Sequence, residues 1–279
     1  MTTRDNSARF QAPNLNVSPE NNSPEQNMGA LQYVVPTELV ELPTRGVFYP
    51  EGHSLHNKQE IEIKTMTAKE EDLLVNKSLL QKGVALDRVL QSLIVDPRIR
   101  LEDLFIGDKN AIIVAARISA YGSDYNVNVS CPGCNVSQKY SFDLEENNIR
   151  FIKDIDVEGV VLTERGTFRM VLPKSEAAIE VKLLSGHDEK QLLGKGKKSD
   201  PSLTQQFKTF ITSVNNVEDR ALVNQFIDVM PAYDSKYLRE TYSKIIPNID
   251  LTQYFECSNC GHSQDMEVPF TVEFFWPRS

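Results

Sequence analysis

The chain has 279 residues, a formal net charge of −9 and a hydrophobic content of 40%. This length allows one or two domains with a sizeable core, and the acidic balance disfavours a protein that coats nucleic-acid phosphates. No apolar stretch approaches the roughly 18 residues needed to cross a bilayer, so we expect no membrane partner. The first ten residues lack the apolar core of a secretory signal, which favours synthesis in a cytosol, where thiols stay reduced.

Residues 1–35 are rich in polar residues and proline, as in the run 21–27. Such a segment cannot bury enough apolar surface to offset the entropy cost of ordering it. We therefore expect a disordered N-terminal arm, either without a role or ordered by a partner.

An N-terminal α/β segment is predicted over residues 36–124. It opens with the loop Glu41–Pro50, in which two prolines and a glycine set turns around an aromatic pair. We interpret it as a packed entry loop, with a binding loop as the alternative. Apolar and polar residues then alternate over Glu60–Met66, which predicts a strand.

Helical patterns fill the rest of this segment. We predict helices over residues 67–83, 86–95 and 108–122. The first begins with a capping-box pattern, because Glu70 lies three residues after Thr67. The third is rich in alanine and β-branched residues, so a buried strand remains the alternative there.

The chain has four cysteines, which form two Cys-x-x-Cys turns, Cys131–Cys134 and Cys257–Cys260. Each turn lies between two alternating segments, a pattern that predicts a β-hairpin with the cysteines at its tip. The predicted strands are Tyr125–Ser130 with Lys139–Leu144, and Leu251–Glu256 with Asp265–Val268. Two such knuckles supply the four thiolates that a tetrahedral Zn²⁺ requires.

Three alternatives to zinc are two local disulfides, an iron–sulfur cluster and free buried thiols. A redox Cys-x-x-Cys motif usually begins a helix, and neither turn does so here. Four thiolates complete the coordination of the metal, so the expected site is structural and holds no reactive water. We predict that Cys131, Cys134, Cys257 and Cys260 bind one structural Zn²⁺.

Residues 145–250 lie between the two hairpins and show strand and helix patterns. The predicted strands are Phe168–Leu172 and Ile179–Leu184, and the predicted helices are Asp188–Leu193, Leu203–Val214, Asp219–Val229 and Ser235–Ile245. The fold class is therefore α+β. A zinc-ribbon-like β-hairpin module spans residues 125–279, and its two knuckles are separated by a mainly helical insertion, the α+β stretch 145–250.

The histidines give weaker signals. His262 follows Cys260 closely, but we expect it beside the metal ligands or in solvent rather than among them. His53 and His56 lie three residues apart, and with Glu51 and Glu60 nearby they could form a metal pair, but a loop histidine pair is usually polar surface. His187–Asp188 reads as helix capping rather than acid–base catalysis, because no nucleophile stands at a recognisable spacing.

Two further segments carry candidate interactions. The glycine- and lysine-rich run 194–199 lacks the spacing of a phosphate-binding loop, so we expect a solvated basic loop. Near the C-terminus, Phe274–Trp276 either completes the core or anchors a neighbouring subunit. Core packing is the favoured interpretation.

Several of these features occur together in a known order. The run Leu42–Pro50, a helical segment, Tyr121–Gly122, the two cysteine pairs and the ending Phe274–Pro277 resemble the T4-like baseplate hub family of contractile-tailed bacteriophages. The resemblance covers about residues 40–279. It implies a protein of the virion tail baseplate that is made in the host cytoplasm and contacts other baseplate or tail subunits. It transfers no catalytic residue.

We therefore predict a non-enzymatic structural or assembly protein of a phage tail baseplate hub, held together by structural zinc. The sequence leaves open whether the protein forms a homo-oligomer, and nucleic acid is not an expected partner. The alternative function is a zinc-ribbon adaptor associated with nucleic acid or transcription. The cysteine knuckles favour that alternative, whereas the acidic charge and the lack of interleaved basic and aromatic residues oppose it.

Overall fold

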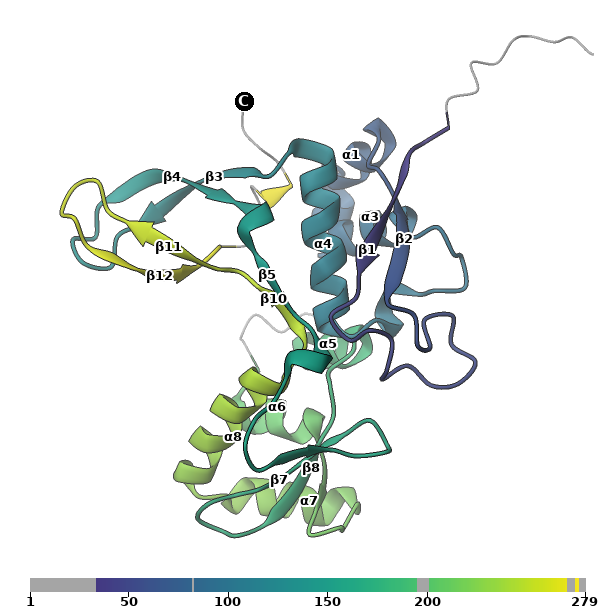
Figure 1. Ribbon diagram of the computed structural model, residues 1–279, viewed down its shortest axis with the longest axis vertical. Helices are drawn as coiled ribbons and strands as arrows, with labels where there is room; N and C mark the ends of the chain where they lie inside the picture. The colour runs from purple at the N-terminus through teal and green to yellow at the C-terminus, as the bar shows by residue number, and fades with distance from the viewer. Residues whose placement is uncertain (1–33, 82, 195–200, 270–273, 276–279) are drawn as a thin grey trace, which may run out of the picture. The chain divides into compact units, whose positions relative to one another are not determined.

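A computed structural model describes residues 34–81, 83–194, 201–269 and 274–275 of the chain. The chain divides into a unit of residues Met1–Val34 and a unit of residues Val35–Ser279. The expected N-terminal arm, residues 1–35, lies outside the described residues except for its last two positions. The elements below all belong to the second unit (Figure 1).

Strands and helices alternate irregularly along the sequence. The strands are β1 (Thr37–Glu41), β2 (Glu60–Lys64), β3 (Asp124–Ser130), β4 (Ser137–Asp143), β5 (Asn148–Arg150), β6 (Val160–Leu162), β7 (Phe168–Val171), β8 (Ala178–Val181), β9 (Ile211–Val214), β10 (Asn248–Asp250), β11 (Thr252–Glu256) and β12 (Ser263–Glu267). The α-helices are α1 (Ala68–Leu74), α2 (Lys77–Gln81), α3 (Ala85–Leu93), α4 (Ile106–Tyr121), α5 (Gly186–Leu193), α6 (Leu203–Phe210), α7 (Arg220–Val229) and α8 (Ala232–Ile245). Short 3₁₀ turns are η2 (Leu101–Asp103), η3 (Leu144–Glu146) and η4 (Ile152–Asp154).

The strands of the described residues form small antiparallel sheets. Four sheets have two strands each, β1–β2, β3–β4, β5–β10 and β11–β12, and one has the order β6–β7–β8–β9. Because the helices stand beside these antiparallel sheets and do not connect parallel strands, the fold is α+β, as the sequence predicts.

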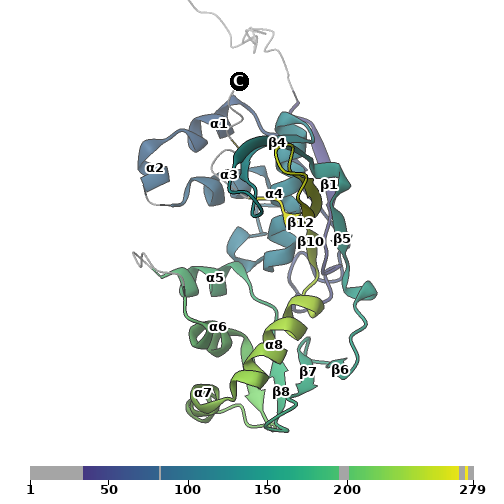
Figure 2. The same ribbon diagram turned by 90° about the vertical axis from the view of Figure 1, so that its left-hand side faces the viewer.

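The described residues form two hydrophobic cores. The first joins the N-terminal elements to both cysteine hairpins around helix α4, and it includes Leu42, Ile112, Phe142 and Phe255. The second belongs to the insertion, where helices α6–α8 pack on strands β7–β9. Figure 2 shows the elements of this second core grouped below α4. The insertion therefore has its own packed interior.

The start of α4 joins the two cores. The Ile106 N–H donates to the Leu184 carbonyl at 3.0 Å, and the Gly186 N–H donates to the Leu104 carbonyl at 2.9 Å. Gly107 lies so close to the insertion that an added Cβ would stand 2.0 Å from the Pro247 carbonyl oxygen. Only glycine allows this approach of the two backbones.

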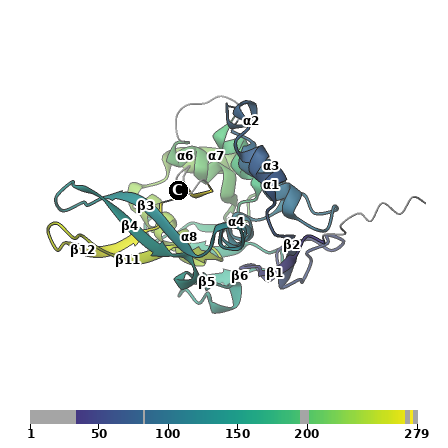
Figure 3. The same cartoon turned by 90° about the horizontal axis from the view of Figure 1, so that it is seen from above.

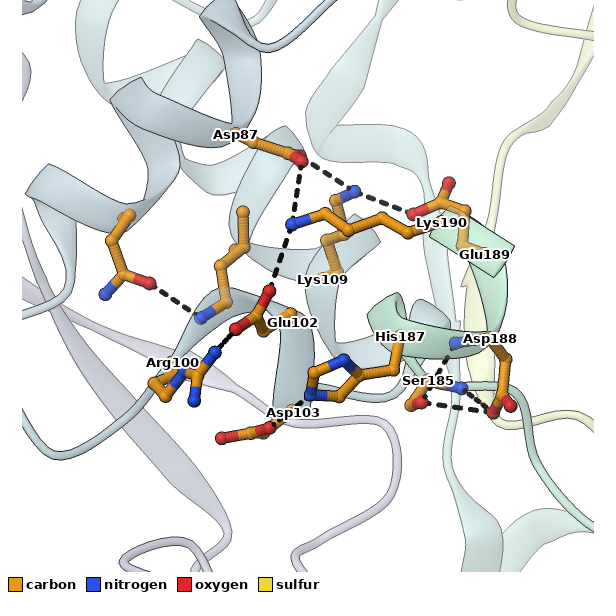
Figure 4. A network of polar contacts seen from close by, with 12 residues as sticks. Asp87, Arg100, Glu102, Asp103, Lys109, Ser185, His187, Asp188, Glu189 and Lys190 are labelled. Carbon is orange, nitrogen blue, oxygen red and sulfur yellow. Dashed lines mark hydrogen bonds and ion pairs between the residues drawn. The ribbon is translucent and has the colours of Figure 1, made fainter. Parts of the chain in front are cut away.

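Charged side chains surround the same junction (Figure 4). Lys109 of α4 lies 3.1 Å from Asp87 of α3 and 2.8 Å from Glu189 of α5, and its side chain is mostly buried. Lys190 also reaches Asp87 and Glu102. Although burial lowers the pKa of Lys109, the two carboxylates outweigh it and raise that pKa. The ammonium group thus stays charged and links three elements.

The loop Glu41–Pro50 wraps around a buried carboxylate at the start of α4. Asp108 accepts hydrogen bonds from the Thr44 N–H at 3.0 Å, the Thr44 hydroxyl at 2.6 Å and the Tyr49 hydroxyl at 2.7 Å. Thr44, Tyr49 and Asp108 are all buried. Burial raises the pKa of Asp108, and the three hydrogen bonds oppose that rise. The packed entry loop predicted from the sequence is confirmed.

Two predicted helices have different boundaries in the structure. The helix expected over residues 67–83 is interrupted after α1, because the Asn76 side chain accepts the N–H groups of Ser78 and Leu79 and so caps a second helix, α2. The helix expected over Leu203–Val214 ends at Phe210. The β-branched residues of Ile211–Val214 pair with β8 as strand β9 instead.

The other segments predicted to be helical are helices in the structure. Residues 106–121 form α4 and not the alternative strand, and it ends at Gly122. The hairpin strands are confirmed as the β3–β4 and β11–β12 pairs, within one to two residues at most ends.

Candidate metal centre

The four cysteine sulfurs converge on one point at the tips of the two hairpins. All four Sγ atoms lie within 4.8 Å of one another, with Cys131 to Cys260 and Cys134 to Cys257 each at 3.8 Å. All four are free thiols. The local disulfides considered from the sequence, Cys131–Cys134 and Cys257–Cys260, are therefore absent. Two knuckles 122 residues apart in sequence (residues 135–256) thus share one site.

The two knuckles have the same backbone hydrogen bonds. In the first, the Cys131 N–H donates to the Val136 carbonyl, and the Asn135 N–H donates to the Cys131 carbonyl. In the second, Cys257 has the corresponding bonds, with the carbonyl of His262 and with the N–H of Gly261. This repeated turn directs both sulfurs of a knuckle to the same side.

Side chains join the hairpins across the site. The Tyr140 hydroxyl donates to the Tyr254 carbonyl at 3.0 Å. The Gln138 amide group donates to the Glu256 carbonyl at 3.3 Å, and its oxygen accepts the Ser258 hydroxyl at 2.8 Å. Figure 3 shows the two hairpins side by side, as these bonds require. The sulfur cluster is therefore supported by contacts between hairpins as well as within them.

The surroundings favour thiolates at Cys134 and Cys257. The Val136 N–H and the Asn259 amide lower the pKa of Cys134 to about 6. The Cys260 N–H lowers the pKa of Cys257. The His262 N–H acts in the same direction on Cys260, yet hydrogen bonds with the other cysteines raise its pKa to about 12. Cys260 therefore holds its proton more tightly than an ordinary thiol, and a cation at the cluster would oppose that effect.

This donor set fits a zinc ion. Four sulfurs at about 2.3 Å from Zn²⁺ in a tetrahedron stand about 3.8 Å apart. The Cys131–Cys260 and Cys134–Cys257 sulfur distances match that edge. Cys131 and Cys257 are buried, whereas Cys134 is half-buried and Cys260 exposed. In the part of the chain that the structure describes, the cysteines form the only such group of possible metal ligands.

The histidines lie outside this cluster. The ring of His262 packs against Gly133 of the other knuckle, where an added Cβ would stand 2.9 Å from the ring, and its Nε2 lies 3.3 Å from Gln264. It thus lies beside the cysteine cluster, in contact with the other knuckle and outside the group of four possible ligands. Sequence reasoning did not find this contact, because it depends on the fold bringing residues 133 and 262 together.

The other loop histidines hold backbone turns. His53 stacks on Tyr49 at 4.7 Å, and His56 Nδ1 lies 2.6 Å from the Tyr49 carbonyl oxygen. Both are half-buried, so the expectation of plain polar surface is wrong. Both histidines contact Tyr49, which belongs to the packed loop around Asp108.

The remaining candidates behave as predicted or fall outside the described residues. Asp188 caps helix α5 by accepting the Ser185 N–H and hydroxyl at 3.0 Å each. Phe274 and Phe275 are buried in the first core. Trp276 and residues 195–199 of the glycine–lysine run are outside the described residues.

Comparison with known families identifies the chain. The family described as T4 bacteriophage base plate protein matches residues 50–276. The chain belongs to this family. Searches of curated proteins and of solved structures gave no match. Within the described residues of this baseplate family member, no helix is both long and apolar enough to cross a membrane.

Proposed function

We propose that Cys131, Cys134, Cys257 and Cys260 bind one structural Zn²⁺ in a zinc-ribbon-like module. The convergence of four sulfurs from two matched knuckles supports this assignment. When bound, the ion supplies positive charge to four thiolates and takes no part in a reaction. The module covers residues 125–279, and its insertion 145–250 branches off between the knuckles.

Metal binding closes a loop of 122 residues between the two knuckles. In small zinc peptides, binding contributes about 10–16 kcal/mol to folding. The same ion in this chain fixes two distant β-hairpins against each other beside helix α4. The result is a rigid support for the insertion and for contacts with other subunits.

The family match supports a structural role in a phage tail baseplate. We propose that the chain acts at the hub, as a non-enzymatic subunit or assembly factor that contacts other baseplate proteins in the virion. The closed thiolate site supports this role, because a metal with four protein ligands has no open position for a substrate.

The experiment is quantitative mass spectrometry of purified phage particles and of tail-assembly intermediates. A permanent subunit appears in both, and an assembly factor appears in the intermediates alone. Absence of the chain from both contradicts a baseplate role. The same measurement on particles made with Cys131→Ser tests the proposed zinc site. Ser130→Ala, a change at the adjacent exposed residue, is the matched control.

The alternative is a zinc-ribbon adaptor that binds nucleic acid. The four hairpin strands oppose it, because β3, β4, β11 and β12 together carry one lysine and five carboxylates. Such a surface repels phosphates. Filter binding to DNA or RNA at rising salt separates the functions, since phosphate binding must weaken steeply with salt.

A further inference from the structure

Strand β1 has one edge that carries no strand among the described residues. Its other edge pairs with β2, and the far edge of β2 is bridged by Ile94. The Leu42 N–H donates to the Gln59 carbonyl, and the Thr65 N–H donates to the Pro36 carbonyl. Because bonded and non-bonded residues alternate along an antiparallel strand, the even-numbered residues of β1 are the ones bonded to β2. The backbone N–H and carbonyl of Leu39 therefore point away from β2. The Leu39 side chain is also 65% exposed.

Strand β5 lies on the same side of α4 as β1 (Figure 3). It pairs with β10 and with no other strand of the described residues. Just beyond both strands, the Ile152 N–H donates to the Pro43 carbonyl at 3.0 Å. The segments that follow β1 and β5 thus meet at this end. Alongside the two strands themselves, a cleft separates β1 from β5.

The cleft has an apolar floor and an acidic rim. It measures about 240 Å³ and lies over small and branched residues of α4, namely Ala111, Val114, Ala115 and Ile118. Its charged lining residues are Glu38, Glu41 and Glu145, and no lysine or arginine is among the described residues that line it. Glu41 pairs with Arg45 at 2.9 Å. Glu38 Oε1 is buried and has no hydrogen-bond partner among the described residues.

We propose that this cleft receives an extended segment of another baseplate subunit, which adds as a strand to β1 and places a lysine or arginine against Glu38. The inference rests on the proposed function for the source of that segment. An added strand satisfies the outward backbone groups of Leu39, and its cation satisfies the buried carboxylate oxygen. Alternate side chains of the strand rest on the apolar floor.

The open backbone edge of β1 favours a strand over a helix, because the backbone groups of a helix are bonded within the helix and cannot pair with Leu39. The acidic rim excludes an acidic segment and selects a basic one by charge complementarity. A bound strand next to β1 would continue the β1–β2 sheet across the α4 floor toward β5.

Leu39→Pro is the decisive variant. Proline removes the outward N–H of Leu39 and leaves the bonds between β1 and β2 intact, because that N–H faces away from β2. Leu39→Ala is the matched control, since it shortens the side chain and keeps the N–H. The measured quantity is the amount of this chain per purified particle or tail-assembly intermediate, together with the melting temperature of the isolated protein.

We expect Leu39→Pro to lower incorporation at least tenfold while its melting temperature stays within a few degrees of Leu39→Ala. Glu38→Gln should lower incorporation several-fold, and Glu60→Gln, at an exposed position of β2, should leave it unchanged. Equal incorporation of Leu39→Pro and Leu39→Ala overturns the proposal. Absence of even the wild-type chain from particles and intermediates overturns the baseplate role and, with it, the partner named here.

A second measurement keeps the proposal testable if Leu39→Pro fails to fold. A photo-crosslinking benzoylphenylalanine at position 39 is introduced into the full chain, and crosslinked peptides from illuminated assembly intermediates are sequenced. A peptide of a different baseplate subunit with a lysine or arginine beside the crosslink supports the proposal. A crosslink to a second copy of this chain, to nucleic acid or to nothing overturns it.

Discussion

Asn135 and Gly261 occupy equivalent positions in the two knuckles. Each follows the second cysteine of its turn, has a positive φ (57° and 69°), and donates its N–H to the carbonyl of the first cysteine, at 2.8 and 2.9 Å. This left-handed conformation turns the chain back after the cysteines. The sulfur geometry therefore depends on a backbone state that glycine and asparagine tolerate best.

Gly261→Ala should destabilise the protein by about 1 kcal/mol, because an L side chain in the left-handed region costs about that much. A Cβ at position 261 would meet no atom within 4 Å, so the cost comes from the backbone alone. Gly261→Asn should cost clearly less, since it reproduces the residue found at position 135. Urea unfolding measures both changes, and equal stability of the two variants would refute this explanation.

Gly107→Ala should destabilise the protein by about 1–3 kcal/mol, the usual cost of overpacking. Replacing glycine with alanine within a helix normally stabilises it by about 0.5–1 kcal/mol, so the sign itself is informative. The reason is the 2.0 Å approach of the added Cβ to the Pro247 carbonyl oxygen. Ser119→Ala on the same helix is the control, and thermal unfolding should show it near neutral. A stabilising Gly107→Ala would mean that α4 and the insertion do not pack this closely.

Thr44→Val should destabilise the protein by about 1–3 kcal/mol, because it leaves a buried carboxylate oxygen of Asp108 without the Thr44 hydroxyl. Thr37→Val removes a comparable hydroxyl–carboxylate bond, Thr37 to Glu62 at 2.7 Å, at an exposed site. That control should cost less than about 0.5 kcal/mol. Denaturant unfolding of the two variants compares them directly, and similar losses would argue against the buried network around Asp108.

The stability contributed by Glu70 should depend on pH. Although burial raises its pKa, hydrogen bonds from Thr67 and Ser92 outweigh it and lower that pKa below the usual value of 4.5. A lowered folded-state pKa gives stability that is present above the unfolded pKa and is lost as the pH falls through the folded one. Glu70→Gln should therefore be about 1 kcal/mol less stable at pH 7 and approach the wild type near pH 3. A stability difference that stays constant between pH 3 and pH 7 would contradict this assignment.

The cysteine site could be predicted from the sequence because each knuckle carries its own local signal. The spacing within Cys131–Cys134 and Cys257–Cys260 and the alternation around them depend on neighbouring residues alone. Helix α4 was predictable for the same reason, since its long apolar pattern ends at Gly122. Local patterns of this kind survive in the fold.

Features that depend on distant partners could not be predicted. Strands β5 and β10 are three residues each, too short for a periodic pattern, and they pair across about 100 residues of sequence. Strand β9 has a helix-compatible sequence that its pairing with β8 overrides. The cleft beside β1 exists because residues 38–41, 111–118 and 144–149 meet in the folded chain.

The most direct test of the central proposal is the metal content of the full chain purified under reducing conditions, measured by inductively coupled plasma mass spectrometry. The four converging sulfurs predict one zinc per chain, lost in a variant with Cys131→Ser and Cys257→Ser and retained in Ser130→Ala. Removal of that zinc with a chelator should lower the melting temperature of the wild type. Protein that contains no metal yet melts at the same temperature with and without chelator would contradict the account.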